Sequence, residues 1–299
     1  MNPNFRRAIY LTYAVLIFSY CLTGCQETVS VDMKSLIPPS DKYDVRIIRD
    51  TWGVPHIYGK TDADVAYGLG WAQIEDDFEN SYATFLMGRG KYATVAGRSG
   101  APFDYLYHLF RFRDIVEREY EKQISPEVRA LCEAYAEAFN HYAALYPEKL
   151  DTSLLPATGK DIVTGFAMRV PFFFGMERQI KQIMGAERKG EVSRPEQARS
   201  GGTLSRGLPI GSNTFAIAPS RTPDGKTHLA VNSHQPFEGP VAWYEARLKS
   251  EEGMDIIGGV FPGSPVVLHG HNPDLGWAHT VNLPDLCDVY VLEMHPDDP

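Results

Sequence analysis

The most regular alternation of hydrophobic and polar residues in the chain follows Ser125. Apolar residues recur there every three or four positions, which predicts an amphipathic helix with one buried face. The stripe consists of Val128, Leu131, Cys132, Tyr135, Phe139, Tyr142 and Leu145. Ser125 can cap the N-terminus of this helix, and Pro126 suits its first position. The pattern favours core packing over a cofactor site.

Two other segments have helical patterns. The segment TDADVAYGLGWAQIEDDFENSYATFLMGRGK has Thr61 or Asp62 as its N-cap, followed by an acidic first turn. The segment TGFAMRVPFFFGMERQIKQIMG is apolar and then amphipathic, and Pro171 is expected to break or kink it. The first half of the chain is therefore predicted to be mostly helical.

Strand patterns flank this helical region. Val45, Ile47 and the pair Ile57-Tyr58 predict two strands around the turn RDTWGVPH. Near residue 212 the strand patterns resume, with NTFAIA and HLAVNS joined by TPDG. Pro presets φ in such a turn and Gly accepts a positive φ, so these runs predict a hairpin. Four strand-like runs follow: VAWYEARLKS, MDIIGGVF, PVVLHG and LGWAHTV.

The segment between the helical and strand-rich parts has a different composition. Residues 191–211 are polar, basic and rich in Gly, Ser and Pro, which is typical of an exposed linker.

The N-terminus has the pattern of an export signal. Arg6 and Arg7 precede an uncharged apolar run that is short for a membrane span and fits a signal peptide over residues 1–25. Leu22-Thr23-Gly24-Cys25 resembles a bacterial lipobox, so Cys25 is the expected lipidation site; a plain signal peptide cleaved nearby is the alternative. Gln26 favours an outer-membrane lipoprotein facing the periplasm, and residues 26–41 form a polar tether.

Composition and charge narrow the function classes. The chain has 299 residues, of which 43% are hydrophobic and 22% charged, which is ordinary for a globular protein with a large core. Its net charge of −9 gives no indication of the basic surface that binding to a nucleic acid needs. Cys132 and Cys287 remain after the signal region, and an oxidising compartment would permit a bridge, although two buried thiols are preferred.

The candidate chemistry centres on a serine at the start of the hairpin. A serine hydroxyl needs an adjacent base to act as a nucleophile. A cut between Gly211 and Ser212 would give Ser212 a free α-amine, whose pKa of about 7.7–8.0 leaves much of it neutral near pH 7. Gly211 allows the peptide bond that would be cleaved to adopt a backbone geometry that residues with a side chain cannot adopt.

Two blocks of the sequence resemble a known family. The first is RDTWGVPHIYGKTDADVAYGLGWAQIEDDF. The second is GSNTFAIAPSRTPDGKTHLAVNSHQPFEGPVAWYEARL, continued by FPGSPVVLHGHNPDLGWAHTVNLPDLCDVYVLE. They are similar to the openings of the α and β chains of the penicillin acylase family of N-terminal-nucleophile hydrolases. Residues 42–190 then resemble the α chain, 191–211 a spacer removed on maturation, and 212–299 the start of the β chain.

The resemblance implies a fold and an activity. The fold is α+β, a four-layer αββα sandwich that is incomplete in this chain, with a mostly helical N-terminal α-chain region. The activity is hydrolysis of N-acyl amides of the acyl-homoserine lactone, penicillin or cephalosporin type. It is performed by an α/β heterodimer that a single precursor makes by cutting itself between Gly211 and Ser212, without a catalytic cofactor.

The resemblance also assigns residues. Ser212 matches the catalytic nucleophile and Asn213 the residue after it. His234 matches a supporting histidine found in the homoserine-lactone and cephalosporin branches; a purely structural histidine is the alternative. Val281 matches the residue whose backbone N–H donates to the oxyanion.

A structural calcium ion is a further implication. Asp285 and Asp288 match calcium ligands of some members, with Glu177 as an α-chain ligand; solvated loop carboxylates are the alternative. Four other histidines lack the spacing of a metal site, and structural roles are favoured for His56, His269, His271 and His279. Phe172 to Phe174 fit core packing better than a lining of the acyl pocket.

The chain departs from the family pattern at its end. It stops at Pro299, before the family's second oxyanion donor and a supporting arginine. We therefore expect either the front part of an amide hydrolase precursor, or a truncated inactive remnant or surface-binding lipoprotein that keeps the fold. A conventional Ser-His-Asp hydrolase is disfavoured, because GSNTF opens a strand and does not form a GxSxG elbow.

Overall fold

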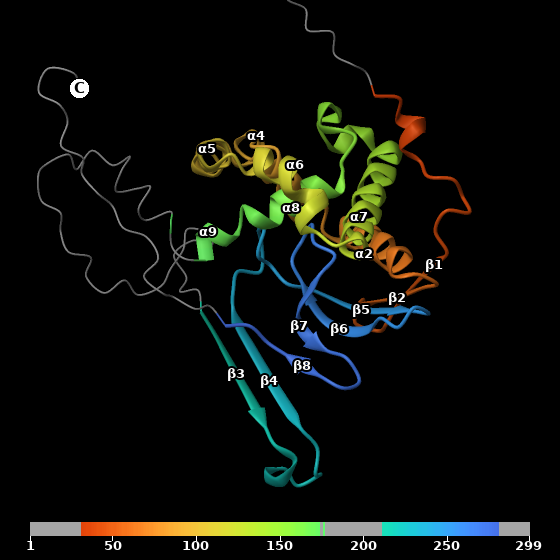
Figure 1. Ribbon diagram of the computed structural model, residues 1–299, viewed down its shortest axis with the longest axis vertical. Helices are drawn as coiled ribbons and strands as arrows, with labels where there is room; N and C mark the ends of the chain where they lie inside the picture. Colours follow the sequence, from red (N-terminus) through yellow and green to blue (C-terminus); the bar gives the residue numbers. More distant parts are fainter. Residues whose placement is uncertain (1–30, 174–175, 177–210, 281–299) are drawn as a thin grey trace, which may run out of the picture.

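The computed structural model describes residues 31–173, 176 and 211–280 (Figure 1). Helices lie together on one side of a six-stranded sheet, and a two-stranded hairpin projects away from this body. This arrangement confirms the α+β fold class. The four-layer sandwich and the domain boundaries stay predictions.

The helices occupy the first half of the described residues. Their bounds are α2 Asp62–Asp76, α3 Phe78–Gly88, α4 Ala93–Ala96, α5 Ala101–Phe110, α6 Phe112–Gln123, α7 Pro126–Leu145, α8 Gly159–Ala167 and α9 Val170–Phe173. Short 3₁₀ turns lie at Met33–Leu36, Gly97–Ser99, Pro147–Lys149, Thr152–Leu154 and Pro219–Arg221. Among the described residues, no helix is long and apolar enough to cross a membrane.

Helix α7 confirms the sequence prediction in its start and its buried face. The Ser125 side chain accepts a hydrogen bond from the backbone N–H of Val128 at the N-terminus. Cys132, Tyr135, Phe139 and Tyr142 are buried, and α7 packs mainly on α2. The two ends of the predicted stripe differ from expectation: Val128 and Leu145, in the first and last turns of the helix, are 40% and 47% exposed.

The predicted helix after residue 61 is in fact two helices. Thr61, one of the two expected caps, begins α2. Its side chain accepts a hydrogen bond from the Asp64 backbone N–H, and the Asp64 side chain accepts one from the Thr61 backbone N–H. The chain leaves helical geometry at Asp77, with φ −141° and ψ 61°, and α3 begins at the next residue. The Asp77 carboxylate accepts hydrogen bonds from the Asn80 side chain, and such local bonding favours helix ends over helix interiors.

The main sheet joins the two halves of the chain. Its order is β1-β2-β5-β6-β7-β8, with bounds Val45–Arg49, Pro55–Gly59, Tyr244–Ser250, Asp255–Val260, Val267–His271 and Gly276–Trp277. These strands confirm the predicted strand runs. Strand β2 pairs with β5 in parallel, whereas the other pairs are antiparallel. The helical half therefore contributes two strands to a sheet that the later half completes.

The predicted hairpin is also confirmed. Strands β3 (Gly211–Ile217) and β4 (His228–His234) pair in antiparallel register, and Gly225 in the connecting loop has a φ of 67°. Phe215 and Ile217 share one face, as expected, but are 64% and 42% exposed. Among the described residues, the hairpin is thus not covered on that face.

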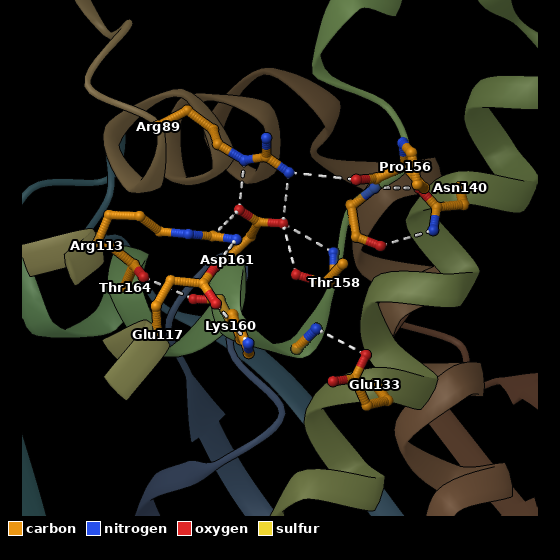
Figure 2. Close-up of polar contacts among 12 residues, drawn as sticks. Arg89, Arg113, Glu117, Glu133, Asn140, Pro156, Thr158, Lys160, Asp161 and Thr164 are labelled. Atoms are coloured by element: carbon orange, nitrogen blue, oxygen red, sulfur yellow. Dashed lines mark hydrogen bonds and ion pairs between the residues drawn. The ribbon is translucent and has the colours of Figure 1, made fainter. Parts of the chain in front are cut away.

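A buried carboxylate fixes the position of α8 (Figure 2). The Asp161 side chain is fully buried and accepts hydrogen bonds from Arg89, from Arg113 at 2.6 Å, and from the backbone N–H of Thr158 at 2.8 Å. These donors come from the end of α3, from α6 and from the cap of α8 itself. The predicted break near Pro171 is observed two residues earlier, where α8 ends and the chain turns through Met168 and Arg169 into α9.

We expect Asp161→Ala to lower the free energy of unfolding by about 3 kcal/mol, because it leaves two half-buried guanidinium groups without their shared partner. Urea denaturation measures this loss. Asp114→Ala is the matched control, since it removes a carboxylate from an exposed pair with Arg111 and should change stability little. Equal effects of the two substitutions would contradict this account of α8.

Candidate active site

Ser212 lies at the edge of a cavity between the helical half and the strands. It is the second residue of β3 and is half-buried. The cavity has a volume of about 450 Å³, within the range of small-molecule sites. Its lining is mainly apolar and aromatic: Phe166, Val170, Phe173, Ser212, Gln235, Trp243, Phe261, Leu268, His269, His279 and Thr280. A molecule whose apolar part occupies such a cavity can place a polar group next to this serine hydroxyl.

The Ser212 hydroxyl points at the peptide that precedes it. Its Oγ donates a hydrogen bond to the carbonyl oxygen of Gly211, at 2.5 Å. The hydroxyl therefore lies next to the carbonyl group of the predicted cleavage site.

The hairpin register decides which side chains share a face with Ser212. Directly opposite residues of an antiparallel pair lie on the same face, and faces alternate along each strand. Ser212 is opposite Ser233, whereas His234 is opposite Gly211 and so lies on the other face. The exposed His234 ring has its Nε2 at 3.2 Å from Nδ2 of both Asn213 and Asn232. Among the described residues it makes no hydrogen bond to Ser212.

His269 reaches the Ser212 face from the main sheet. Its Nδ1 lies 3.1 Å from the Ser233 Oγ, and its ring lies against that of Trp243, with centroids 4.4 Å apart. Gly259 pairs with His269 in the ladder, and a Cβ there would come within 2.8 Å of the Trp243 ring. A glycine at this position thus gives Trp243 the room to cover His269.

Burial lowers the pKa of His269 below its ordinary value near 6.5. The nearby His279 ring lowers it further, and a hydrogen bond to the His279 backbone opposes the shift. The neutral imidazole is therefore the favoured form at neutral pH.

A buried arginine supports the cavity wall. Arg169 is 1% exposed and donates to the Thr84 hydroxyl and to the Pro262 carbonyl. Its guanidinium lies over the Phe261 ring, 5.6 Å from the centroid. Burial lowers its pKa to about 9, and its Nε and one terminal nitrogen have no partner among the described residues. Arg169 thus ties α3, the α8–α9 turn and the loop after β6 together behind the cavity.

Several predicted residues lie outside the described part of the chain. These are Val281, Asp285, Asp288, Glu177, Cys25 and Cys287. Thr280, which precedes Val281, lines the cavity. No group of three His, Cys, Asp or Glu side chains within residues 31–173, 176 and 211–280 is arranged to hold a metal ion. The calcium site and the oxyanion donor therefore stay predictions.

The structure revises one sequence interpretation and places four histidines. Phe173 lines the cavity, whereas the sequence favours core packing for it; the Phe172 side chain and Phe174 lie outside the described residues. Of the four histidines for which structural roles are favoured, His269 and His279 line the cavity, His56 pairs with Asp50 and His271 is exposed; their roles stay a prediction.

Sequence reasoning missed Ser233 and the role of His269. Strand alternation in the predicted hairpin would have placed Ser233 on the face of Ser212 and His234 on the other. The contact of Ser233 with His269 had no such signal, because it joins two different sheets.

Comparisons with known proteins agree with these observations. A family model described as penicillin amidase matches residues 44–299. The chain is 26% identical to the acyl-homoserine lactone acylase PvdQ of Pseudomonas putida, over 95% of this chain and 40% of that protein. It is 24% identical to the penicillin acylase 2 proenzyme of a Pseudomonas species, over 88% of this chain and 39% of that protein. The chain thus spans about two fifths of the length of these relatives.

A comparison with solved structures matched a thermostable penicillin G acylase from Alcaligenes faecalis. The TM-score is 0.36 and the sequence identity 18%, and the match covers 53% of this chain and 98% of the other.

The lowered pKa of His269 predicts a pH dependence of stability. The folded state binds a proton at this site less readily than the unfolded state, so the contribution of neutral His269 is present above about pH 6.5 and is lost as the pH falls towards the folded pKa. Urea midpoints measured between about pH 7.5 and 5.5 should therefore fall more steeply for the wild type than for His269→Asn. If the urea midpoints of the two proteins fall in parallel with pH, the pKa of His269 is not lowered by folding.

Proposed function

Because the chain belongs to the penicillin amidase family, we propose that it is an amide hydrolase of the acylase type, which removes the acyl group from N-acyl amides. The observation that carries this proposal is the position of Ser212. It follows Gly211 at the start of β3 and lies at the edge of an apolar cavity of about 450 Å³.

The first step is the release of Ser212 as a chain terminus. Its Oγ, which lies beside the Gly211 carbonyl, adds to the carbonyl carbon and passes its proton to the departing amine as the C–N bond breaks. Water then hydrolyses the resulting ester, leaving a carboxylate on Gly211 and a free α-amine on Ser212. The two products form the α/β heterodimer.

The second step is turnover. The α-amine of Ser212 accepts the Oγ proton through a bridging water, and Oγ attacks the substrate carbonyl. The substrate amine leaves with a proton, and a water molecule hydrolyses the acyl-enzyme to a carboxylic acid. The Val281 N–H stabilises the oxyanion, and His234 supports the new N-terminus through Asn213, with which it is in contact.

The lining of the cavity supports a choice of substrate class. Phe166, Val170, Phe173 and Phe261 present apolar surface and would hold the acyl chain, with the amide at Ser212. We therefore propose aliphatic N-acyl amides, including acyl-homoserine lactones, as substrates. PvdQ, a relative named as an acyl-homoserine lactone acylase, supports this choice.

The proposal extends to location and metal content. The chain is exported to the bacterial envelope and lipidated on Cys25, so that the enzyme faces the periplasm. Asp285, Asp288 and Glu177 hold a structural calcium ion, which takes no part in catalysis.

Expression of the full gene product tests the first step. Mass spectrometry and N-terminal sequencing should find a new terminus at Ser212, and Ser212→Ala should give an uncut chain without amidase activity. Ser220→Ala is the matched control, because Ser220 lies in the exposed turn at the far end of the hairpin. An uncut wild-type protein that hydrolyses no amide would overturn the proposed function and leave the binding lipoprotein or the inactive remnant.

Val170→Phe tests the acyl site. The larger side chain should fill part of the cavity and lower kcat/KM for the p-nitroanilide of decanoic acid by about 10-fold or more, while the acetyl compound is affected less. The same substitution at Val128, which is similarly exposed on α7, should leave both values unchanged. Equal losses on both substrates would place the acyl chain elsewhere.

A further inference from the structure

A hydrogen-bonded pair of side chains lies directly across the ladder from Ser212. Ser233 occupies the opposite position on β4, and opposite residues of an antiparallel pair have their Cβ atoms about 4.5–5.5 Å apart. The Ser233 Oγ is 3.1 Å from Nδ1 of His269, which lines the same cavity as Ser212. The hairpin and the main sheet thus meet through this pair beside the candidate nucleophile.

The surroundings of His269 hold its ring in one orientation. Trp243 covers one side of the ring, and the His279 ring lies nearby, with centroids 6.1 Å apart. The neighbouring strand contributes Gly259, which has no side chain to displace the imidazole. Because the ring is fixed, its Nδ1 is presented to Ser233.

The chemistry of the pair follows from its donors and acceptors. A neutral imidazole has one acceptor nitrogen, and a serine hydroxyl has one proton and two lone pairs. When Nδ1 accepts the Ser233 proton, the Ser233 oxygen is left as an acceptor towards Ser212. When His269 is protonated, Nδ1 becomes a donor and the Ser233 proton has to point elsewhere.

We propose that Ser233 and His269 act as a positioning pair for Ser212, in which His269 fixes the direction of the Ser233 hydroxyl and Ser233 offers an oxygen acceptor to the Ser212 terminus. This inference rests on the proposed function and adds two residues to it. Neither residue forms a bond to substrate; the pair sets the orientation of the group that does.

The proposal predicts an acid limb in the pH profile of turnover. The groups that face His269 are the Ser233 hydroxyl, the Trp243 ring and the exposed His279, whose ring centroid is 6.1 Å away, and Ser212 lines the same cavity. No carboxylate belongs to this set within the described residues. Protonation of His269 reverses its bond to Ser233, so kcat should fall further as the pH drops through the titration of His269, beyond the loss that protonation of the Ser212 α-amine causes.

Five variants of the full gene product separate this role from a structural one. Ser233→Ala and His269→Phe remove the bond. Ser233→Thr keeps the hydroxyl, and His269→Asn keeps an acceptor close to the Nδ1 position without a titrating group. His271→Asn is the matched control, because His271 lies on the same strand, is exposed and bonds to the backbone of Asn272. Cleavage at Ser212 is measured by mass spectrometry, and kcat and KM by hydrolysis of the decanoyl p-nitroanilide.

We expect Ser233→Ala and His269→Phe to be cleaved at Ser212. Their kcat should be lower than that of the wild type by about 10- to 100-fold, whereas KM should change much less, as for a misplaced reacting group. Ser233→Thr should recover most of the loss. The kcat of His269→Asn should exceed that of His269→Phe and should fall less at acid pH than that of the wild type, because only the Ser212 α-amine then titrates. His271→Asn should match the wild type.

Two results would overturn the inference while the proposed function stands: an active wild type whose kcat and pH profile are unchanged by Ser233→Ala and His269→Phe, or a fall of kcat at acid pH that is the same in His269→Asn as in the wild type. A wild type with no cleavage and no hydrolysis would instead overturn the proposed function, and the pair with it.

Discussion

The structure depends on the parallel pairing of β2 with β5. These strands come from opposite sides of the Gly211–Ser212 bond, and each would leave an open edge without the other. Side chains reinforce the join: Gln73 and the Tyr135 hydroxyl both accept a hydrogen bond from the Gly263 N–H. A cut before Ser212 therefore divides the chain without dividing the sheet or its core, and the new terminus stays beside the cavity.

The cavity wall depends on a second constraint, the burial of Asp161. A carboxylate without access to water needs donors, and Arg89 and Arg113 bring these from two other helices. The anchored α8 then carries Phe166 to the cavity, and the turn through Arg169 directs α9 to its side. Charge burial at one end of α8 thus fixes apolar surface at the other.

Local features of the fold could be predicted from the sequence. Ser125 and Pro126 marked the start of α7, and TPDG marked the hairpin, because caps and turns are set by neighbouring residues. The break at Asp77 and the parallel β2–β5 pair could not be predicted, since they depend on how distant elements pack.

The candidate site, too, could be predicted from the sequence only in part. Ser212 was identified from its position after Gly211 and from family resemblance. The face of His234, the cavity position of Phe173 and the contact between Ser233 and His269 required the register and packing of the folded chain. A sequence pattern identifies the reactive group more readily than the groups that orient it.

The alternation of faces in the β3–β4 hairpin also bears on how this chain can evolve. A one-residue insertion or deletion within β4 would exchange the faces of Ser233 and His234, and so change the partners on both sides of the ladder at once. Length changes in the exposed loop between the strands carry no such penalty, because the ladder can keep its register. Related chains should therefore vary in that loop and keep the spacing from Ser212 to Ile217 and from His228 to His234 intact.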